Sequence, residues 1–404
     1  MIDAWQRAWG LLLISACFHP SYDHPACGRN GECPAGFTCN AQLICDNGSS
    51  AMDAPALDAS SSIDSVPGIA CYGPSGAWRV CLGSTPTATT SVPSTIDTDT
   101  SSLCLPIQPV GWTLSQPEAC FIVGKTVSVK ATVVHGHRPL VVVAQDGITV
   151  TSLLDVASHR ADTGTARSSS ACKPFQRSAV VGGGGQNPGG GGGAGGSFMT
   201  RAGNGGGGDD GRNLGGQAAD ADASAPVLLR GGCAGQAGGG SPMDDAGGGG
   251  GAMYLVAGNQ IGITGAINAS GAGGAGASNT AGGSGGGSGG MIVLYAPSVT
   301  TTATTILLAN GGGGGGGGGG TSPSFTGAAG KDPVVMIPVM PAAGGLGGGN
   351  AGDGAAGFPA TTVDATTNGN PGEGGGGGGG GAGYIQTNQS LGAATVSPVA
   401  RISS

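Results

Sequence analysis

Glycine limits what this chain can fold into more than any other feature of its sequence. The chain has 404 residues, of which 90 are glycine, and most of these lie after residue 180. Uninterrupted runs occupy 182–185, 247–251, 311–320 and 374–381. Glycine loses more backbone freedom on ordering than any other residue, so helices and isolated strands are unfavourable in such stretches. Composition of this kind indicates disorder unless another pattern argues against it.

Short strand-like patterns interrupt the glycine runs. Residues 143–150, 256–263 and 295–301, and more loosely 386–392, each start with an apolar stretch ending near alanine and then cross two or three polar residues. Apolar and polar residues then alternate, as in a half-buried strand. We interpret these segments as a degenerate internal repeat with irregular spacing. A disordered chain would have no physical reason to keep such a pattern.

The region before the glycine runs shows the clearest strands. Apolar and polar residues alternate at 127–133, and turns are expected at 135–139 and 145–147. Further strands are expected at 140–144, 148–150 and 154–156. One rung of short strands cannot bury its inward face alone, but stacked rungs bury a continuous apolar column. The sequence therefore predicts an all-β protein with an irregular parallel β-helix-like core, and a β-sandwich is the alternative.

The glycine-rich segments are expected as long insertions in this core. Polyglycine can form an extended threefold helix, similar to a collagen chain, whose backbone groups bond to neighbouring helices. Ordered helices and mobile loops are two alternatives that the sequence leaves open. The stretches 247–257 and 286–296 resemble the glycine-rich domain of anaplastic lymphoma kinase receptors. That resemblance implies polyglycine helices bundled beside β structure.

The amino terminus resembles that of bacterial lipoproteins. A short apolar run leads to Ile14-Ser15-Ala16-Cys17, which is similar to the lipobox of that family. The resemblance implies a signal peptide at 1–16, cleavage before Cys17 and lipid on its thiol. The apolar run is too short to cross a bilayer, which requires about 20 apolar residues. An ordinary cleaved signal peptide, with Cys17 in a structural role, is the alternative.

The cysteine content indicates an oxidising compartment. Of 11 cysteines, all except Cys17 form an even set, which favours disulfide bonds. The candidates are Cys27, Cys33, Cys39, Cys45, Cys71, Cys81, Cys104, Cys120, Cys172 and Cys233. The group at 27–45 resembles small cysteine-rich, EGF-like modules, which are too short to fold without covalent links. Zinc is the alternative there, although close Cys-x-x-Cys pairs are absent.

Composition divides the chain into consecutive parts. They are a lipoprotein signal peptide at 1–16, a lipid anchor and short tether at 17–26, the cysteine-rich module at 27–45, an Asp/Ser/Pro-rich linker at 46–70, a cysteine-containing β region at 71–180 and a glycine-rich β-repeat region at 181–404. The linker is expected to be extended, with a mean reach of roughly 25–30 Å. A disulfide between Cys172 and Cys233 is expected to clip a glycine loop to the β domain.

Two histidine-containing groups could carry chemistry. His135-Gly-His137 has a spacing that can ligate a metal, but no acidic or cysteine partner is near in sequence, and a β-turn is favoured. Asp155 and His159 could belong to a hydrolase triad with a nearby serine. No nucleophile motif such as Gly-x-Ser-x-Gly occurs, so a triad is disfavoured.

Paired carboxylates offer a second kind of candidate site. Asp209, Asp210, Asp244 and Asp245 are weak calcium candidates and could also serve a polysaccharide hydrolase. The tandem Gly-Gly-x-Gly-x-Asp repeat of calcium-binding secreted toxins is missing. We favour the interpretation that these aspartates solubilise glycine loops. No catalytic residue, metal or cofactor is therefore predicted.

Charge and motif content exclude several classes of partner. The formal net charge is −8 with only 15 basic residues, and these do not cluster, so no nucleic acid partner is expected. No Lys-Ser/Thr pair follows a glycine run, so a nucleotide-binding P-loop is absent. The chain as a whole resembles the glycine-rich exported lipoproteins of myxobacteria and related bacteria, through its lipobox, its 27–45 module, and the segments 96–101, 138–144 and 229–233. That resemblance implies a location more than an activity.

We therefore expect an exported lipoprotein without enzymatic activity and with a structural or adhesive role in the cell envelope. Phe18 follows Cys17, and in lipoproteins the absence of Asp at that position accompanies sorting to the outer membrane. The expected location is the outer membrane, facing the cell surface or the periplasm. The expected partners are the membrane, through lipid on Cys17, and a cell-surface polysaccharide or protein. A carbohydrate- or peptide-binding surface module and a polysaccharide-degrading β-helix enzyme are the alternatives.

Overall fold

A computed structural model describes most of the chain after residue 68. The described residues are 33, 38–39, 45–46, 69–112, 116–160, 171–182, 189–241, 246–320, 325–367 and 370–403. They are rich in strands, contain no α-helix and form mostly parallel sheets, so the strand-rich class is confirmed. Consequently no helix in this part of the chain is long and apolar enough to cross a membrane. Contacts divide the chain into two units, Met1–Asp64 and Ser65–Ser404.

Little of the first unit belongs to the described residues. Strands β1 (Thr38–Cys39) and β2 (Cys45–Asp46) pair antiparallel, with Cys39 opposite Cys45. Cys33 forms a disulfide. The predicted signal peptide, Cys17 and Cys27 lie outside the described residues.

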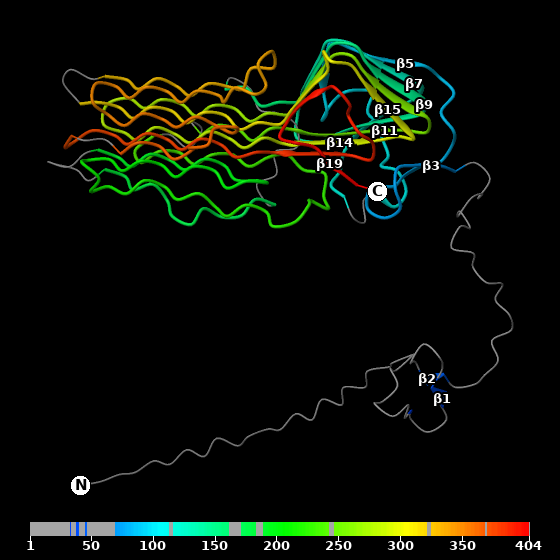
Figure 1. The fold of residues 1–404 in the computed structure, drawn as a ribbon, viewed down its shortest axis with the longest axis horizontal. Helices are drawn as coiled ribbons and strands as arrows, with labels where there is room; N and C mark the ends of the chain where they lie inside the picture. Colours follow the sequence, from blue (N-terminus) through cyan, green and yellow to red (C-terminus); the bar gives the residue numbers. More distant parts are fainter. Residues whose placement is uncertain are drawn as a thin grey trace, which may run out of the picture. The chain divides into compact units, whose positions relative to one another are not determined.

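The second unit is built on two parallel sheets (Figure 1). The larger one contains β5 (Thr90–Val92), β7 (Cys120–Val129), β9 (Leu140–Val150), β11 (Ala252–Ala257), β12 (Gln260–Ile263), β14 (Met291–Tyr295), β15 (Ser298–Thr301), β17 (Tyr384–Thr387) and β19 (Arg401–Ile402). The smaller one contains β6 (Thr95–Asp97), β8 (Thr132–His135), β10 (Leu153–Asp155), β13 (Ala266–Asn268), β16 (Ile306–Leu308) and β18 (Thr395–Ser397). A short antiparallel pair, β3 (Ala70–Tyr72) and β4 (Val80–Leu82), precedes them.

The strand segments compared in the sequence lie side by side. Val256 pairs with Val143, and Ile263 pairs with Val150, so the stretches 143–150 and 256–263 are in register along their whole length. The next segment continues the stack, because Ile261 also pairs with Val299 of β15. Each strand of the larger sheet thus meets its equivalent from an earlier or later part of the chain.

Two local expectations from the sequence are wrong. The turn expected at 145–147 lies inside β9, whose two halves pair separately with β11 and β12. β11 and β12 follow one another along one side of β9, and β7 pairs along the other side, so the backbone stays extended through a bend where the register with β7 shifts. The strand expected at 127–133 instead ends at Val129 and resumes as β8 in the other sheet. Thr132 fixes this corner, because its Oγ1 donates a hydrogen bond of 2.8 Å to the Pro93 carbonyl.

Apolar side chains cover both faces of the larger sheet over the first half of β9 and the neighbouring strands β11 and β14. One face contributes Val142, Leu255 and Leu294 to a core that also includes Leu154 and Ile267 of the smaller sheet. The opposite face packs under a second cluster, which contains the residues Phe121, Val141, Tyr254, Trp112, Val80, Phe198 and Leu229. Burial on both faces explains why this part of the sheet reads as continuous apolar runs and not as an alternating pattern.

The glycine-rich segments are ordered and leave the sheets between the strands. They lie between β10 and β11, between β13 and β14, and between β16 and β17, and run side by side away from the sheets (Figure 1). We call them together the glycine bundle. Its extended segments are 189–197, 201–208, 213–219, 229–240, 246–251, 269–277, 281–290, 309–319, 325–331, 342–348, 351–358, 363–367 and 374–383.

Hydrogen bonds in the bundle repeat every three residues. In segment 281–290, successive N–H groups donate to three neighbouring segments in turn, over distances of 2.7 to 3.0 Å. For the N–H groups of Gly282 to Gly290, in that order, the acceptors are the carbonyls of Gly239, Gly375, Ala275, Gln236, Gly378, Ala272, Cys233, Gly381 and Ala269. Three further segments, 189–197, 246–251 and 309–319, donate to its carbonyls. Segment 281–290 is therefore bonded to six neighbours, and its period is that of a threefold extended helix.

Two other segments, 309–319 and 374–383, are likewise bonded to six neighbours. These three, which we call the central segments, contain the two longest glycine runs of the chain, 311–320 and 374–381. The reason is steric. A Cβ atom at Gly315 would collide with the Ala275 carbonyl, and one at Gly377 would collide with the Ser284 carbonyl. At each glycine of the central segments a Cβ atom would come within 3.0 Å of neighbouring backbone, and the few polar side chains there, such as Ser288 and Asn310, are buried.

Six of the predicted disulfide cysteines are joined in pairs within the second unit. The pairs are Cys71–Cys81, Cys104–Cys120 and Cys172–Cys233. The first links β3 to β4, and the second links the loop after β6 to the start of β7. The third joins residues 171–182 to segment 229–240, so it attaches to the glycine bundle itself.

Candidate functional site

His159 lies just beyond β10, where the smaller sheet continues into the glycine bundle. Its Nε2 atom is 3.1 Å from Asp155 Oδ2, and its Nδ1 atom is 3.6 Å from Asp332 Oδ2. Asp155 is placed by β10 and accepts a 3.2 Å hydrogen bond from Asn268 Nδ2. Asp332 accepts a 2.7 Å hydrogen bond from the backbone N–H of Gly273. The histidine thus bridges two carboxylates that the backbone holds in place.

This bridge favours the doubly protonated ring. Hydrogen bonds to Asp155 and Asp332 raise the pKa of His159 to about 10. Burial alone would raise the pKa of Asp332, but the hydrogen bonds from His159, Gly273 and Arg160 together outweigh burial and lower it. A charged imidazole has no lone pair with which to accept a proton. Ser158 Oγ donates to the Gly249 carbonyl, and His159, held between the two carboxylates, acts as an ion-pair link.

The pair His135 and His137 flanks a turn, as the sequence favours. Gly136 between them has a φ of 105°, in the left-handed region that suits glycine. Asp99 closes this turn, because both of its carboxylate oxygens accept the His137 N–H at 3.0 Å, and its Oδ2 lies 2.8 Å from His137 Nδ1. Arg138 Nε lies 3.8 Å from Asp99 Oδ1. These contacts fasten the turn.

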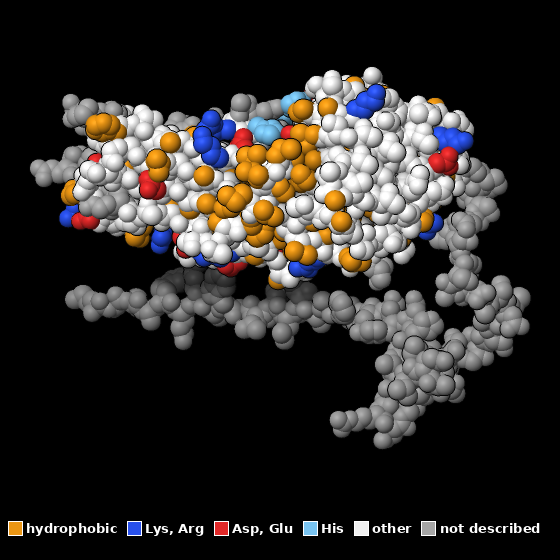
Figure 2. All heavy atoms as spheres, turned by 45° about the horizontal axis from the view of Figure 1, so that its top comes forward, with side chains coloured by type: hydrophobic (Ala, Val, Ile, Leu, Met, Phe, Trp, Pro, Cys, Tyr) orange, Lys and Arg blue, Asp and Glu red, His pale blue; other side chains and the backbone are white. Residues whose placement is uncertain are grey.

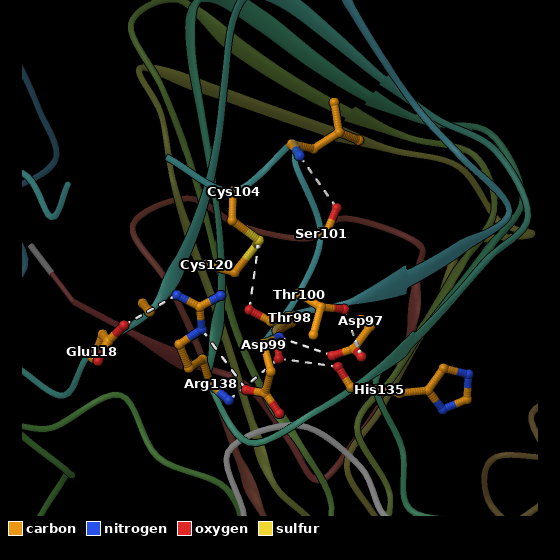
Figure 3. Close-up of a disulfide and its surroundings, with 12 residues drawn as sticks. Asp97, Thr98, Asp99, Thr100, Ser101, Cys104, Glu118, Cys120, His135 and Arg138 are labelled. Atoms are coloured by element: carbon orange, nitrogen blue, oxygen red, sulfur yellow. Dashed lines mark hydrogen bonds and ion pairs between the residues drawn. A yellow bond between two sulfur atoms is a disulfide. The ribbon is translucent and has the colours of Figure 1, made fainter. Parts of the chain in front are cut away.

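The loop that carries Asp99 sits beside the Cys104–Cys120 disulfide (Figure 3). Thr98 is buried, and both its backbone N–H and its Oγ1 donate to the His135 carbonyl, at 2.9 and 3.0 Å. The His135 ring points away from the disulfide and from Asp97 (Figure 3). A backbone hydrogen bond from Asp99 and a second from Thr100 Oγ1 lower the pKa of Asp97. These interactions hold the backbone of the loop in place.

Of the weak calcium candidates, Asp209 and Asp210 form a tight turn in the bundle, while Asp244 and Asp245 lie outside the described residues. Both turn residues have a positive φ, 50° and 54°. Asp209 is fully buried, its Oδ1 accepts a 2.7 Å hydrogen bond from Gly372 N–H, and its Oδ2 lies 3.8 Å from Arg212 Nη1. The described part of the chain contains no group of three or more His, Cys, Asp or Glu side chains that could hold a metal.

A shallow depression lies on the larger sheet, at the bend of β9. Its volume is about 360 Å³, and it is lined by Thr126, Val127, Ser128, Asp146, Gly147, Thr149, Asn259 and Gln260. Parallel pairing brings Thr126 and Gln260 to either side of Gly147, so three strands supply one surface. Lys125 Nζ lies 3.8 Å from Asp146 Oδ2 at its margin. The lining offers hydroxyl, amide and carboxylate groups, which suit a ligand rich in hydroxyls.

A buried arginine near the Cys172–Cys233 disulfide escaped the sequence analysis. Arg230 Nη2 lies 2.5 Å from Asp222 Oδ2, and its guanidinium stacks 4.0 Å from the centre of the Phe198 ring. Its Nη1 contacts both sulfur atoms, at 3.8 and 3.6 Å. Burial lowers the pKa of Arg230, and the Asp222 carboxylate opposes that effect. The sequence carried no signal for this cluster, because its members are brought together only by the bundle.

An exposed apolar loop at 333–341 was also missed. Met336 is 81% exposed and Val339 is 68% exposed, although both are large hydrophobic residues. A signal for it was present, since no residue from 333 to 343 has a polar side chain. Long glycine runs flank this apolar stretch in the sequence.

The chain as a whole matches no protein-family model, no curated protein and no solved structure.

Proposed function

We propose that this protein is an exported lipoprotein, anchored through Cys17, with a structural or adhesive role in the cell envelope. The observation that carries the proposal is the glycine bundle, whose central segments expose neither side chains nor unbonded directions to a ligand. Such a body can act as a stiff spacer or contact surface. The three disulfides of the second unit suit an oxidising compartment outside the cytoplasm.

We infer that the strands form a parallel β-helix and that the bundle consists of polyglycine helices inserted between its rungs. In-register parallel pairing of β9, β11 and β14 supports the first point. The three-residue period of the hydrogen bonds supports the second. The rungs would anchor the ends of the glycine helices, which cannot form a side-chain core of their own.

A non-catalytic role agrees with what the polar groups do. His159 is held as a cation between two carboxylates, Asp209 accepts a hydrogen bond from a backbone N–H, and Asp99 fastens a turn by accepting another. Each group is committed to holding backbone in place. A glycosidase would instead need two carboxyl groups that face a shared substrate cleft.

Protease treatment of intact cells tests the proposal. Cells expressing the wild-type chain or Cys17→Ala would be treated with protease and blotted for residues 71–404, with a periplasmic protein as the internal control. We expect the wild-type chain to be cleaved at the surface and the variant to be released into the medium. Equal fatty-acid labelling of the wild-type chain and of Cys17→Ala would contradict lipid anchoring. Protection of an anchored wild-type chain would rule out adhesion and leave a periplasmic scaffold.

A carbohydrate-binding role is the second candidate, and the depression at the bend of β9 favours it. Two of its lining side chains, Asp146 and Gln260, can bond to sugar hydroxyls. Binding of the full chain to insoluble cell-wall polysaccharide would be measured for wild type, for Asp146→Ala with Gln260→Ala, and for Asp210→Ala as the matched exposed control. Saturable binding that only the double variant loses would support this role. Equal binding by all three proteins would exclude the depression as the carbohydrate-binding site.

A further inference from the structure

The loop at 333–341 is the most exposed apolar feature on its face of the protein. Hydrophobic side chains gather there in one patch (Figure 2). Its large side chains are exposed to the following extents: Val334 52%, Met336 81%, Ile337 49%, Val339 68% and Met340 57%. Exposed apolar side chains are normal when scattered, but a contiguous group marks a contact surface.

The loop is held in this exposed shape by its backbone. Ile337 N–H donates to the Val334 carbonyl at 3.1 Å, and Met340 N–H donates to the Ile337 carbonyl at 2.9 Å, which makes two successive turns. Asn310, at the start of a central segment, donates from Nδ2 to the Pro338 carbonyl at 2.9 Å, and Pro338 itself is buried. The turns push the apolar side chains outward while the proline seats the loop on the bundle.

The composition of the loop suits lipid better than it suits a protein partner. Protein interfaces carry about one hydrogen bond per 100–200 Å², whereas residues 333–343 have no polar side chain with which to make one. A backbone N–H without a hydrogen-bond acceptor is costly to place in hydrocarbon. Pro333, Pro338 and Pro341 have no N–H, and the turns bond those of Ile337 and Met340, so the loop carries fewer such groups than an ordinary loop of its length. We propose that the 333–341 loop inserts into the surface of a phospholipid bilayer.

The charges at the base of the loop agree with this proposal. Asp332 precedes the loop, and His159 pairs with its carboxylate. Lys331 and Arg160 are exposed, and the Arg160 N–H donates to Asp332 at 3.3 Å, so both cations lie at the base. Exposed cations beside an apolar insertion favour anionic lipid headgroups.

The proposed function would bring the loop to a membrane. Delivery of the loop to the bilayer rests on that proposed function, because it requires lipid on Cys17. The linker expected at 46–70 has a mean reach of roughly 25–30 Å, so an anchored chain stays close to the bilayer. Tethering raises the effective concentration of a weak second contact. Insertion of the loop would then lay the second unit against the membrane.

Vesicle binding by the full chain carrying Cys17→Ala tests the loop without the anchor. The probe is vesicles of phosphatidylethanolamine and phosphatidylglycerol, collected by sedimentation. We expect binding, and we expect Met336→Ser, Val339→Ser and Met340→Ser together to weaken it by about tenfold or more. The matched control is Ile107→Ser, Val399→Ser and Ile402→Ser, which removes side chains that are 80%, 86% and 66% exposed elsewhere. This control variant should bind vesicles as strongly as the Cys17→Ala chain without further changes.

A site-specific readout guards against general effects of the triple variant. Met336→Cys, labelled with an environment-sensitive dye, should shift to the blue with vesicles, and labelled Ile107→Cys should not. The absence of binding, or equal binding by loop and control variants, would overturn the proposal. A dimer in sedimentation that forms without lipid and is broken by the loop variant would overturn it in favour of a second copy. Fatty-acid labelling of wild type against Cys17→Ala tests the anchor separately, so either idea can fail alone.

Discussion

The parallel sheets and the glycine bundle are stabilised by opposite means. In the sheets, side chains such as Leu255 and Ile261 fill the space between strands, and their burial supplies the main favourable free energy. In the bundle, the central segments consist mostly of glycine, so neighbouring backbones approach closely enough for N–H groups to bond to the carbonyls of adjacent segments. The sheets depend on buried side-chain carbon atoms, and the bundle depends on the absence of Cβ atoms from its glycines.

This difference predicts which changes each region tolerates. Ordering glycine costs more conformational entropy than ordering any other residue, and the bundle gains little apolar burial in return. It is attached instead to the sheets at both ends of each insertion and to a disulfide at Cys233. We expect the bundle to respond to lost links and added methyl groups, and the sheets to lost methyl groups.

Loss of the bundle's disulfide should have the largest effect. Cys172 and Cys233 are 61 residues apart, so Cys172→Ser with Cys233→Ser should lower the free energy of unfolding by about 4 kcal/mol in the chain-entropy account. The matched control is Cys104→Ser with Cys120→Ser, which opens a loop of 16 residues at the sheets and should cost about 3 kcal/mol. Urea unfolding measures both. A larger loss at the sheets would show that loop length does not decide the cost.

A single methyl group in a central segment should come next. Gly377→Ala places Cβ against the Ser284 carbonyl, and backbone cannot move aside as a side chain does, so we expect a loss of about 3 kcal/mol. Gly83→Ala is the control, since nothing lies near its Cβ position and its φ is outside the left-handed region. It should be neutral or slightly stabilising. Equal unfolding midpoints for the two variants would refute close packing in the bundle.

Removal of one carbon from the sheet core should cost less than its addition to the bundle. Ile261 is fully buried between paired strands, and Ile261→Val should lower the free energy of unfolding by about 1 kcal/mol. Val299→Ala is a useful companion on the neighbouring strand, because Val299 is only half-buried and should lose less. If Ile261→Val proved more damaging than Gly377→Ala, the contrast between the two regions would be wrong.

The strands could be predicted from the sequence because their signal is local. The start of the alternation at 127–133 and the apolar run at 140–144 correspond to the end of β7 and the first half of β9. Their limits could not be predicted, since the continuation of β9 through 145–147 depends on partners more than 100 residues away, such as Gln260. Order in the glycine runs is similarly non-local. A glycine run alone is compatible with disorder, and only its six neighbours give it a fixed place.

The polar groups illustrate the same limit. The sequence places Asp155 four residues before His159, and Asp155 makes the larger contribution to the raised pKa of His159, but Asp332 contributes as well. No local pattern connects Asp332 to His159. The turn at 135–139 was predictable from His135-Gly-His137, whereas its closure by Asp99 depends on the stacking of β6 on β8.

The smallest expected effect concerns His159, which joins the two regions through Asp155 and Asp332. Its folded pKa of about 10 lies above the 6.5 of an unperturbed histidine. The link therefore contributes its full stability below pH 6.5 and loses it as the pH rises through about 10. The side chain is 41% exposed, so solvent screens the link, and we expect it to be worth about 1 kcal/mol or less. Urea unfolding of wild type and His159→Gln at several pH values would measure this. The wild-type advantage should be greatest near pH 6 and absent above pH 10, whereas parallel pH profiles would show that the histidine is not held as a cation between the sheets and the bundle.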